Sequence, residues 1–519
     1  MNPTMTFKDV IDSYQDNSTQ PQTNKEATIK VSAATSVVAF LYEKVRVAVE
    51  FKEDHLLRKL AIGRILNRRI KLGTNRNNLA LYLLKELIRS RYLPNDAVPE
   101  SKVTSITKIL NKYFYILDNY ATVFKFSKWE LTDWLISIAS VEIDESLAPA
   151  TKRNTLALYM AKLLAKETEL NEFDLYLATQ KGLNKSDNAI LRYLIFTHTY
   201  NFWINDPSEE DLKLVASQIE ETVKTINLKV KETLDSRSLK LVKGQIAPFV
   251  ILREITEKDP NFSGTYQDER LLEQKVRNMC ALKYAQVGDR LKRMVVRSVI
   301  YVFLTKMVFG VLIEVPLDRL TLGHINWRAA SINLTFPPIL MYLVGSRTRV
   351  PGEKNTNAIV ARAKSIIVNN ELGLFENELR IGLPKKLNLL RGFFRLFYLF
   401  TFFVSFGAIT YFLLKIGFTF VSVGVFLFFL SVISFFAFII RQSTKDIVLT
   451  HEEDSVLGSV FDLFFLPILR VGQRLSQEIA RLNLFVFFFD FIIEAPLTTI
   501  IEITEEWFAY VREKKEEVV

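Results

Sequence analysis

Residues 398–415 read YLFTFFVSFGAITYFLLK and residues 416–440 read IGFTFVSVGVFLFFLSVISFFAFII, and these stretches decide the fold class. They belong to two apolar segments, Phe394–Leu414 and Ile416–Ile440, that only Lys415 and its neighbours separate. About 20 apolar residues are enough for an α-helix to cross a hydrocarbon core of about 30 Å. We therefore expect a tight hairpin of two transmembrane helices.

The charges that flank this hairpin indicate its orientation. Basic residues lie on both flanks: Lys385, Lys386, Arg391 and Arg395 before it, and Arg441 and Lys445 after it. Because Lys and Arg are enriched in cytoplasmic loops, both ends of the hairpin are expected in the cytoplasm. The net charge of +10 also suits anionic lipid headgroups. The sequence thus predicts a multi-pass protein of the cell membrane with a cytoplasmic N-terminal domain.

Two weaker apolar segments precede the hairpin. Val296–Val315 is long enough to span, but Lys306 lies near its centre, where a lysine costs about 2.5 to 3.5 kcal/mol of insertion free energy. Ser331–Val344 is short and contains Pro337 and Pro338, which break an ordinary helix. We expect a spanning helix followed by a bent or re-entrant return.

The first half of the chain has the charge pattern of a soluble helical protein. Apolar residues recur at spacings of three and four from about residue 31 to 200, as in Val103, Ile106 and Leu110, and strand-like alternation is scarce. This pattern predicts an all-α fold with a helical bundle over 29–205. The polar residues 1–28 contain no apolar core of a secretory signal and are expected to form a disordered tail.

A long amphipathic helix is expected after the bundle, with Asp206 as its N-cap and Pro207 in its first turn. Its apolar stripe repeats every eleven residues: Leu212, Val215 and Ile219, then Val223, Ile226 and Val230. Such a stripe stays nearly straight and needs a long partner, either the same bundle or an external helix. A second helical pattern, from about 268 to 297, runs directly into apolar sequence and predicts a stalk.

Enzyme signatures are not found in the sequence. It contains no phosphate-binding lysine loop, dinucleotide fingerprint, nucleophile elbow or His-Glu-x-x-His pair. Cys280 is the only cysteine and the four histidines are scattered, so neither a disulfide framework nor a zinc site is expected. We predict a protein without catalytic residues, cofactor or metal.

Charges inside the apolar segments are the sharper signal, because a charge in lipid usually faces a partner or a water-filled cavity. Lys306 and Glu314 lie in or beside the first segment, while Asp490 and Glu494 lie four residues apart on one face of a later helix. One hypothesis pairs Lys306 with Asp490 or Glu494, to fix packing or form an ion path. The alternative is that Lys306 extends to the membrane surface and the two acids lie at the water interface.

Two basic groups are candidates for contact with lipid phosphates. Arg64, Arg68 and Arg69 lie on an amphipathic helix, which suits an anionic lipid surface or a solvated outer face better than nucleic acid, since aromatic residues are not interleaved. The region 442–519 is expected to form interfacial helices before a charged tail. Its three candidate lipid contacts are Arg470, Arg474 and Arg481.

Several short motifs resemble uncharacterised multi-helical membrane proteins of candidate phyla radiation bacteria, which have reduced genomes. The motifs are Tyr42-Glu43-Lys44-Val45-Arg46, Phe51-Lys52-Glu53-Asp54-His55-Leu56-Leu57-Arg58-Lys59, Arg91-Tyr92-Leu93-Pro94 and Asp490-Phe491-Ile492-Ile493-Glu494-Ala495-Pro496. The resemblance implies a bacterial cytoplasmic-membrane protein and transfers no activity.

The most economical function is a membrane-anchored scaffold whose cytoplasmic helices bind a protein partner or self-associate. The alternative is a small transporter or channel that uses the intramembrane charges. The expected segments are a tail (1–28), a bundle (29–205), long amphipathic helices and a stalk (206–292), a membrane pair (293–347), a cytoplasmic connector (348–392), a transmembrane hairpin (393–441) and interfacial helices with a tail (442–519).

Overall fold

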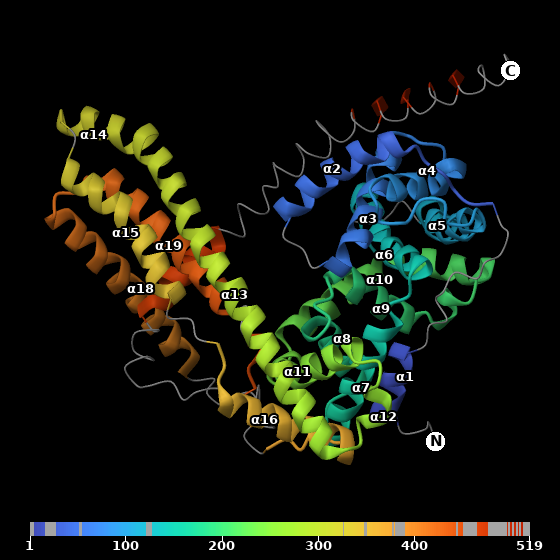
Figure 1. Cartoon of the computed structure of the whole chain (residues 1–519). Helices are drawn as coiled ribbons and strands as arrows, with labels where there is room; N and C mark the ends of the chain where they lie inside the picture. The colour runs from blue at the N-terminus through green and yellow to red at the C-terminus, as the bar shows by residue number, and fades with distance from the viewer. Residues whose placement is uncertain are drawn as a thin grey trace. The chain divides into compact units, whose positions relative to one another are not determined.

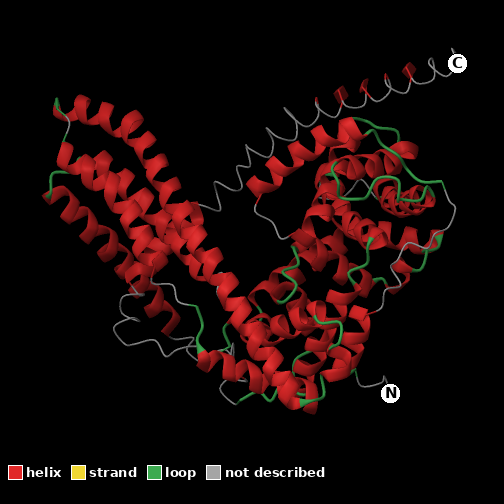
Figure 2. Ribbon diagram, in the orientation of Figure 1, coloured by secondary structure: helices red, strands yellow, loops and turns green. Residues whose placement is uncertain are grey.

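The computed structural model of the chain is all-α, and no strand occurs in the residues that it describes (Figure 2). These residues are 5–15, 27–50, 54–120, 127–324, 326–346, 350–375, 378, 390–442, 445–449, 464–475 and scattered positions between 496 and 511. The chain divides into two compact units, Met1–Val242 with Leu484–Val519, and Lys243–Asn483. The predicted all-α class is confirmed.

The first unit is a bundle of short helices (Figure 1). Its elements are α1 (Phe7–Gln15), α2 (Ala33–Glu50), η1 (Asp54–Leu56), α3 (Leu57–Lys71), α4 (Arg76–Arg89), α5 (Ser101–Asn119), α6 (Lys128–Leu147), α7 (Thr151–Glu167), α8 (Glu172–Gly182), α9 (Asn188–Thr199), η2 (Asn201–Ile204) and α10 (Glu209–Asp235). α6 packs against α3, α5 and α9, and its side chains Leu135 and Ile138 are fully buried. The core therefore forms around α6.

The long helix α10 belongs to this bundle. All of Val215, Ile219, Val223, Ile226 and Val230 are buried in the same core, and the helix packs against α5 and α9. The eleven-residue stripe thus has its partner within the bundle. The first unit consequently extends to Val242, beyond the boundary expected at residue 205.

Two expectations about this unit are wrong in detail. Ser208, rather than Asp206, caps α10, because Ser208 and Asp211 bond each other's backbone N–H groups in a capping box. Residues 1–28 are not entirely a disordered tail, since α1 buries Phe7 and Ile11 and packs against α7. The apolar side chains of α1 recur with helical spacing, which gives this short segment a face to bury.

The second unit contains longer and more apolar helices. Its elements are α11 (Arg237–Lys258), whose first turns precede the unit boundary, α12 (Phe262–Thr265), α13 (Glu269–Phe309), η3 (Gly310–Glu314), α14 (Val315–Leu322), α15 (Trp327–Ser346), α16 (Glu353–Lys364), η4 (Ser365–Asn369), α18 (Leu390–Lys415), α19 (Phe420–Gln442), η5 (Lys445–Ile447) and a helix over 464–475. α13 continues through η3 into α14, so one helical rod runs from the N-cap Asp268 to Leu322. The predicted continuation of this helix into apolar sequence is present, and its role as a membrane stalk stays a prediction.

After Gly323 the chain turns back, and α15 runs beside α13 and α19 (Figure 1). The predicted return is present, but Pro337 and Pro338 do not break it, because α15 stays helical from Trp327 to Ser346. Two prolines remove two backbone donors, and the neighbouring helices hold the remaining turns together.

α18 and α19 form the predicted helical hairpin. The turn between them contains Gly417 with φ +98°, a left-handed conformation that glycine adopts without a steric cost. Asn326, at the start of α15, donates to the Gly417 carbonyl at 2.8 Å. The turn before α15 and the turn of the hairpin therefore lie at the same end of the unit.

The opposite ends of these helices also meet. Asn355 of α16, which follows α15, donates to the Tyr284 hydroxyl of α13 at 2.8 Å and to the Ile447 carbonyl, which follows α19, at 2.7 Å. Leu449 N–H donates back to Asn355 at 2.7 Å. The chain thus returns to the same region of α13 after α15 and again after α19.

Two helical stretches of the described residues, Glu269–Leu320 and Leu396–Lys415, are long and apolar enough to cross a membrane. A core helix of a soluble protein can meet the same criteria, but it is mostly buried. Here only 17% of the most apolar window is buried in either stretch. The apolar surface of this unit therefore faces outward.

Candidate functional site

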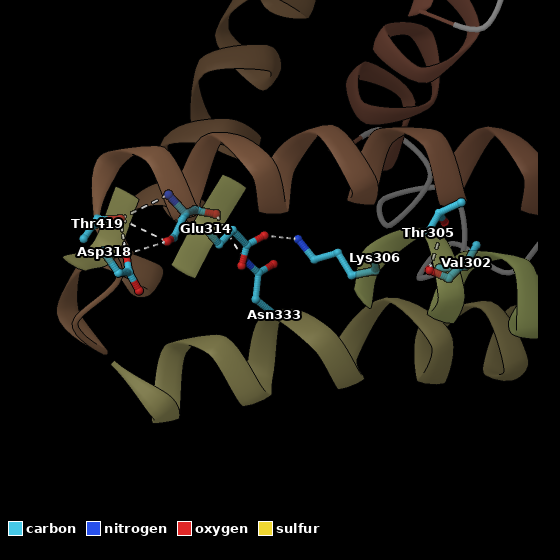
Figure 3. A network of polar contacts seen from close by, with 8 residues as sticks. Val302, Thr305, Lys306, Glu314, Asp318, Asn333 and Thr419 are labelled. Atoms are coloured by element: carbon cyan, nitrogen blue, oxygen red, sulfur yellow. Dashed lines mark hydrogen bonds and ion pairs between the residues drawn. The ribbon is translucent and has the colours of Figure 1, made fainter. Parts of the chain in front are cut away.

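A buried polar network crosses the apolar helices of the second unit (Figure 3). It joins Lys306 of α13, Glu314 of η3, Asp318 of α14, Asn333 of α15 and Thr419, the residue that precedes α19. Lys306, Glu314, Asp318 and Asn333 each expose 5% or less of their surface. Polar groups so deeply buried need hydrogen-bond partners. Within the described residues the network provides them for the two charges of Lys306 and Glu314, whereas Asn333 Oδ1 has none.

Lys306 and Glu314 form an ion pair of 2.5 Å between Nζ and Oε1. Residues eight apart on a regular α-helix are offset by about 80° around the axis. The π-helical turn η3, in which Val315 N–H donates to the Gly310 carbonyl, takes up one extra residue and reduces the effective spacing to about seven, an offset of about 20°. The π-turn therefore brings the two charges onto one face.

The other side of the Glu314 carboxylate is bound by α15. Asn333 Nδ2 donates to Glu314 Oε2 at 2.7 Å and lies 3.5 Å from the Ser422 carbonyl of α19. The Lys306 ammonium also lies 4.6 Å from the centre of the Phe429 ring. Glu314 is thus held by a cation and an amide from two antiparallel helices.

Asp318 of α14 lies one helical turn beyond Glu314 on the same helical face. Its carboxylate is close to the N-terminus of α19. Its Oδ1 accepts hydrogen bonds from the Thr419 hydroxyl at 3.3 Å and the Ser422 hydroxyl at 3.4 Å. Ser422 N–H donates to Thr419 Oγ1 at 3.2 Å, so Thr419 also caps the helix. The positive end of the α19 dipole stabilises the Asp318 carboxylate.

The network is closed at its inner end by apolar side chains. Beyond Lys306, the buried neighbours along these helices are Val302, Met341, Phe429 and Ile433. No group of three or more His, Cys, Asp or Glu among the described residues could hold a metal ion. The arrangement can fix the register of the helices and neutralise charge. It extends from Asp318 to Lys306, a separation of 12 residues or about 18 Å along the helix.

The prediction that Lys306 extends to the membrane surface is wrong, since its ammonium is buried. It is 1% exposed and pairs with Glu314 on its own helix. Asp490 and Glu494, the predicted partners, lie outside the described residues. The sequence signal was misread because a spacing of eight does not indicate one face on a regular helix.

Arg64, Arg68 and Arg69 do not face lipid, and this prediction is also wrong. The Glu86 carboxylate of α4 pairs with Arg68 and, at 2.5 Å, with Arg69, while Arg64 pairs with Glu43 of α2 at 2.7 Å. Arg68 and Arg69 are buried. The three guanidinium groups neutralise acids inside the bundle, and the acids come from helices too far along the sequence for local spacing to reveal.

The later arginines are placed in part. Arg470 and Arg474 are exposed on the helix 464–475, and the Arg470 guanidinium lies 4.8 Å from the centre of the Tyr398 ring. This helix packs Ile468 into the core of α18 and α19. Arg481 lies outside the described residues. Contact with lipid phosphates stays a prediction for all three arginines.

Sequence reasoning missed Asp318, Asn333, Thr419 and Ser422. Asp318 could have been found, because it lies four residues after Glu314 and therefore shares its face. Asn333 and Thr419 carry no such signal, since their roles depend on which helices are neighbours. Comparison with known proteins adds no further assignment: the chain matches no family model, no curated protein and no solved structure.

Proposed function

We propose that this chain is a multi-pass membrane-anchored protein whose N-terminal helical unit is an interaction module at the cytoplasmic face. One observation carries the membrane part of the proposal. Between Arg297 and Arg319, both exposed, every charged residue is buried, namely Lys306, Glu314 and Asp318. The exposed side chains between these arginines are apolar apart from Tyr301. Lipid, not water, suits such a surface.

The length of this exposed surface supports the same proposal. Arg297 and Arg319 are separated by 22 positions in the sequence, or about 33 Å along a helix, which is close to the thickness of a hydrocarbon core. Exposed aromatic residues with polar edges lie near both ends: Tyr301 and Tyr342 at one end, Trp327 and Tyr411 at the other. Tyr and Trp concentrate at both interfaces of membrane proteins.

Paired crossings support a cytoplasmic location for the first unit. The segments that follow α15 and α19 both lie near Tyr284 of α13. The helices α13 to α15 therefore lead away from this end of the unit and back to it, and α18 and α19 form a second such pair. The basic flanks of the hairpin favour the cytoplasm for that end. Exposed apolar side chains on the first unit, such as Leu41, Leu72 and Leu228, are the positions at which the interaction role can be tested.

Cysteine labelling in intact cells tests this topology. In a Cys280→Ser background, Phe420→Cys places a thiol in an 80% exposed position beside the hairpin turn, and Lys128→Cys places one on the first unit. A membrane-impermeant maleimide is expected to label the first thiol directly and the second only after permeabilisation. Labelling of both thiols from one side, or recovery of the chain in the soluble fraction, contradicts the proposal.

Photo-crosslinking tests the interaction role. A photoreactive residue in place of Leu228 is expected to give a discrete adduct in cells, whereas the same group in place of Ser405, which is buried in the other unit, is expected to give none. Absence of an adduct from Leu228, and from equivalent replacements of Leu41 and Leu72, contradicts an interaction module.

A transporter or channel is the second candidate, and the buried charges Lys306, Glu314 and Asp318 are the observation that favours it. Reconstituted vesicles distinguish the two functions. We expect no proton or monovalent-cation flux from the intact chain, because apolar side chains close the network beyond Lys306. Flux that Glu314→Gln abolishes while the protein stays inserted contradicts the anchor and supports transport.

A further inference from the structure

Three arginines on α13 form a stripe immediately before the apolar surface. Arg290, Arg293 and Arg297 are exposed and follow one another at spacings of three and four, so they share one helical face. The buried residues Leu291 and Val295 lie on the opposite face. The arginine stripe therefore points away from the other helices of its unit.

None of these three guanidinium groups forms an ion pair within 4.0 Å in the part of the chain that the structure describes, although Asp289 lies four residues before Arg293. Three basic residues nearer the start of the same helix differ. Lys275 pairs with Asp259 at 2.6 Å, Arg277 with Glu273 at 2.9 Å, and Lys283 with Glu254. The three successive unpaired arginines, Arg290, Arg293 and Arg297, thus adjoin the start of the apolar surface of the helix.

The face that carries the arginines continues without interruption into that surface. Tyr301, Leu304 and Val308 extend the same face beyond Arg297 and expose 50% or more of their side chains. The order along the face is cationic, then aromatic with a hydroxyl, then aliphatic. This is the order in which a bilayer presents phosphate, interface and hydrocarbon.

We propose that Arg290, Arg293 and Arg297 bind the phosphate groups of anionic phospholipids in the cytoplasmic leaflet. This inference rests on the proposed membrane anchor and adds the lipid class that it selects. Guanidinium groups suit this role because their planar donors bind phosphate oxygens in pairs. An acidic protein surface could also attract three arginines, but the adjoining tyrosine and aliphatic residues favour lipid.

Native mass spectrometry of the full chain from bilayers tests the proposal. The chain is reconstituted in phosphatidylcholine mixed with phosphatidylglycerol, and the ratio of the two lipids that stay bound is measured. Changing all three arginines to Gln is expected to reduce the phosphatidylglycerol preference by about fivefold per arginine. Changing them to Lys, which keeps the charge, is expected to retain most of it.

A matched control removes the same charge elsewhere. Lys8, Lys128 and Lys240 are exposed on the first unit, and their joint change to Gln is expected to leave the lipid ratio unaltered. The wild-type preference is expected to decline as salt increases, because headgroup attraction is screened. Single Arg→Gln variants keep the test decisive where the triple variant is recovered poorly.

The outcomes separate this inference from the anchor itself. An unaltered lipid ratio in an Arg→Gln protein that stays in the bilayer overturns lipid selection by the stripe and leaves the anchor intact. Lipid selection by the stripe is likewise overturned where the control variant loses as much preference as the arginine variant. Failure of the wild-type chain to remain in the bilayer overturns the proposed function.

Discussion

At the scale of single residues, the Lys306–Glu314 pair shows how an apolar helix can contain full charges. Each charge is buried and has a partner, and Asn333 binds the remaining carboxylate oxygen. Removing one member of such a pair leaves the other charge buried without compensation, at a cost of about 3 to 5 kcal/mol. Replacing both members with neutral residues leaves neither charge buried without a partner.

We therefore expect Glu314→Gln to reduce the free energy of unfolding of the second unit by about 3 kcal/mol or more in mild detergent. The double variant Lys306→Met/Glu314→Gln is expected to recover much of that loss. Chemical unfolding followed by circular dichroism measures both. Equal destabilisation by the single and double variants contradicts a compensating pair.

Cys280 gives a second prediction at this scale. Its side chain is fully buried in α13, and burial raises the pKa of its thiol to about 11. Because the thiolate is the reactive form, the native chain is expected to resist iodoacetamide at neutral pH, and the denatured chain to react at the rate of an ordinary cysteine. Mass spectrometry follows the modification. Fast labelling of the folded protein contradicts the buried position.

At the scale of secondary-structure elements, the π-turn η3 decides which way the charges point. The π-turn contains one residue more than a regular α-helical turn. Removing one residue from it therefore restores α-helical geometry without rotating Glu314 or Asp318 about the helix axis. Adding a further residue to this turn, which already contains one extra residue, instead rotates everything after it by about 100°. The two changes therefore have opposite consequences for burial of the network.

Deletion of Leu312, which is 68% exposed, is expected to be tolerated. Insertion of one alanine after Leu312 is expected to turn Glu314 and Asp318 toward lipid and to reduce membrane insertion sharply. Protease protection of inserted chain compares the two variants. A deletion as harmful as the insertion contradicts the role assigned to the π-turn.

Gly472 governs a second contact between elements. A side chain at this position would meet the Ser431 carbonyl of α19 at 1.9 Å, so the helix 464–475 approaches α19 closely only because residue 472 is glycine. Gly472→Ala is expected to lower the melting temperature and displace this helix. Gly424→Ala, which adds a methyl group in open space on α19, is the matched control and is expected to change little.

At the scale of the whole molecule, each of the two compact units contains buried ion pairs of its own. In the first unit, Glu86 neutralises two buried arginines, Arg68 and Arg69. In the second, Glu314 neutralises Lys306 between apolar helices. Because each core is formed within its own unit, the units are expected to lose structure in separate transitions.

Glu86→Gln is expected to reduce the free energy of unfolding of the first unit by about 3 kcal/mol or more. The unfolding transition of the second unit is expected to stay unchanged. Asp118→Asn, which removes an exposed pair with Arg76, is expected to cost about 1 kcal/mol or less. Calorimetry in detergent resolves the two transitions. A shift of both transitions by Glu86→Gln contradicts independent units.

The sequence by itself determined the all-α class, the hairpin of α18 and α19, the continuous helix α13 and the apolar stripe of α10. These features follow from the spacing of apolar residues within one segment, which is a local property. Only the tertiary structure decided that Arg64, Arg68 and Arg69 face inward and that Lys306 pairs with Glu314. Burial of a charge depends on which distant helix supplies the opposite charge, and on one π-turn that regular periodicity cannot reveal.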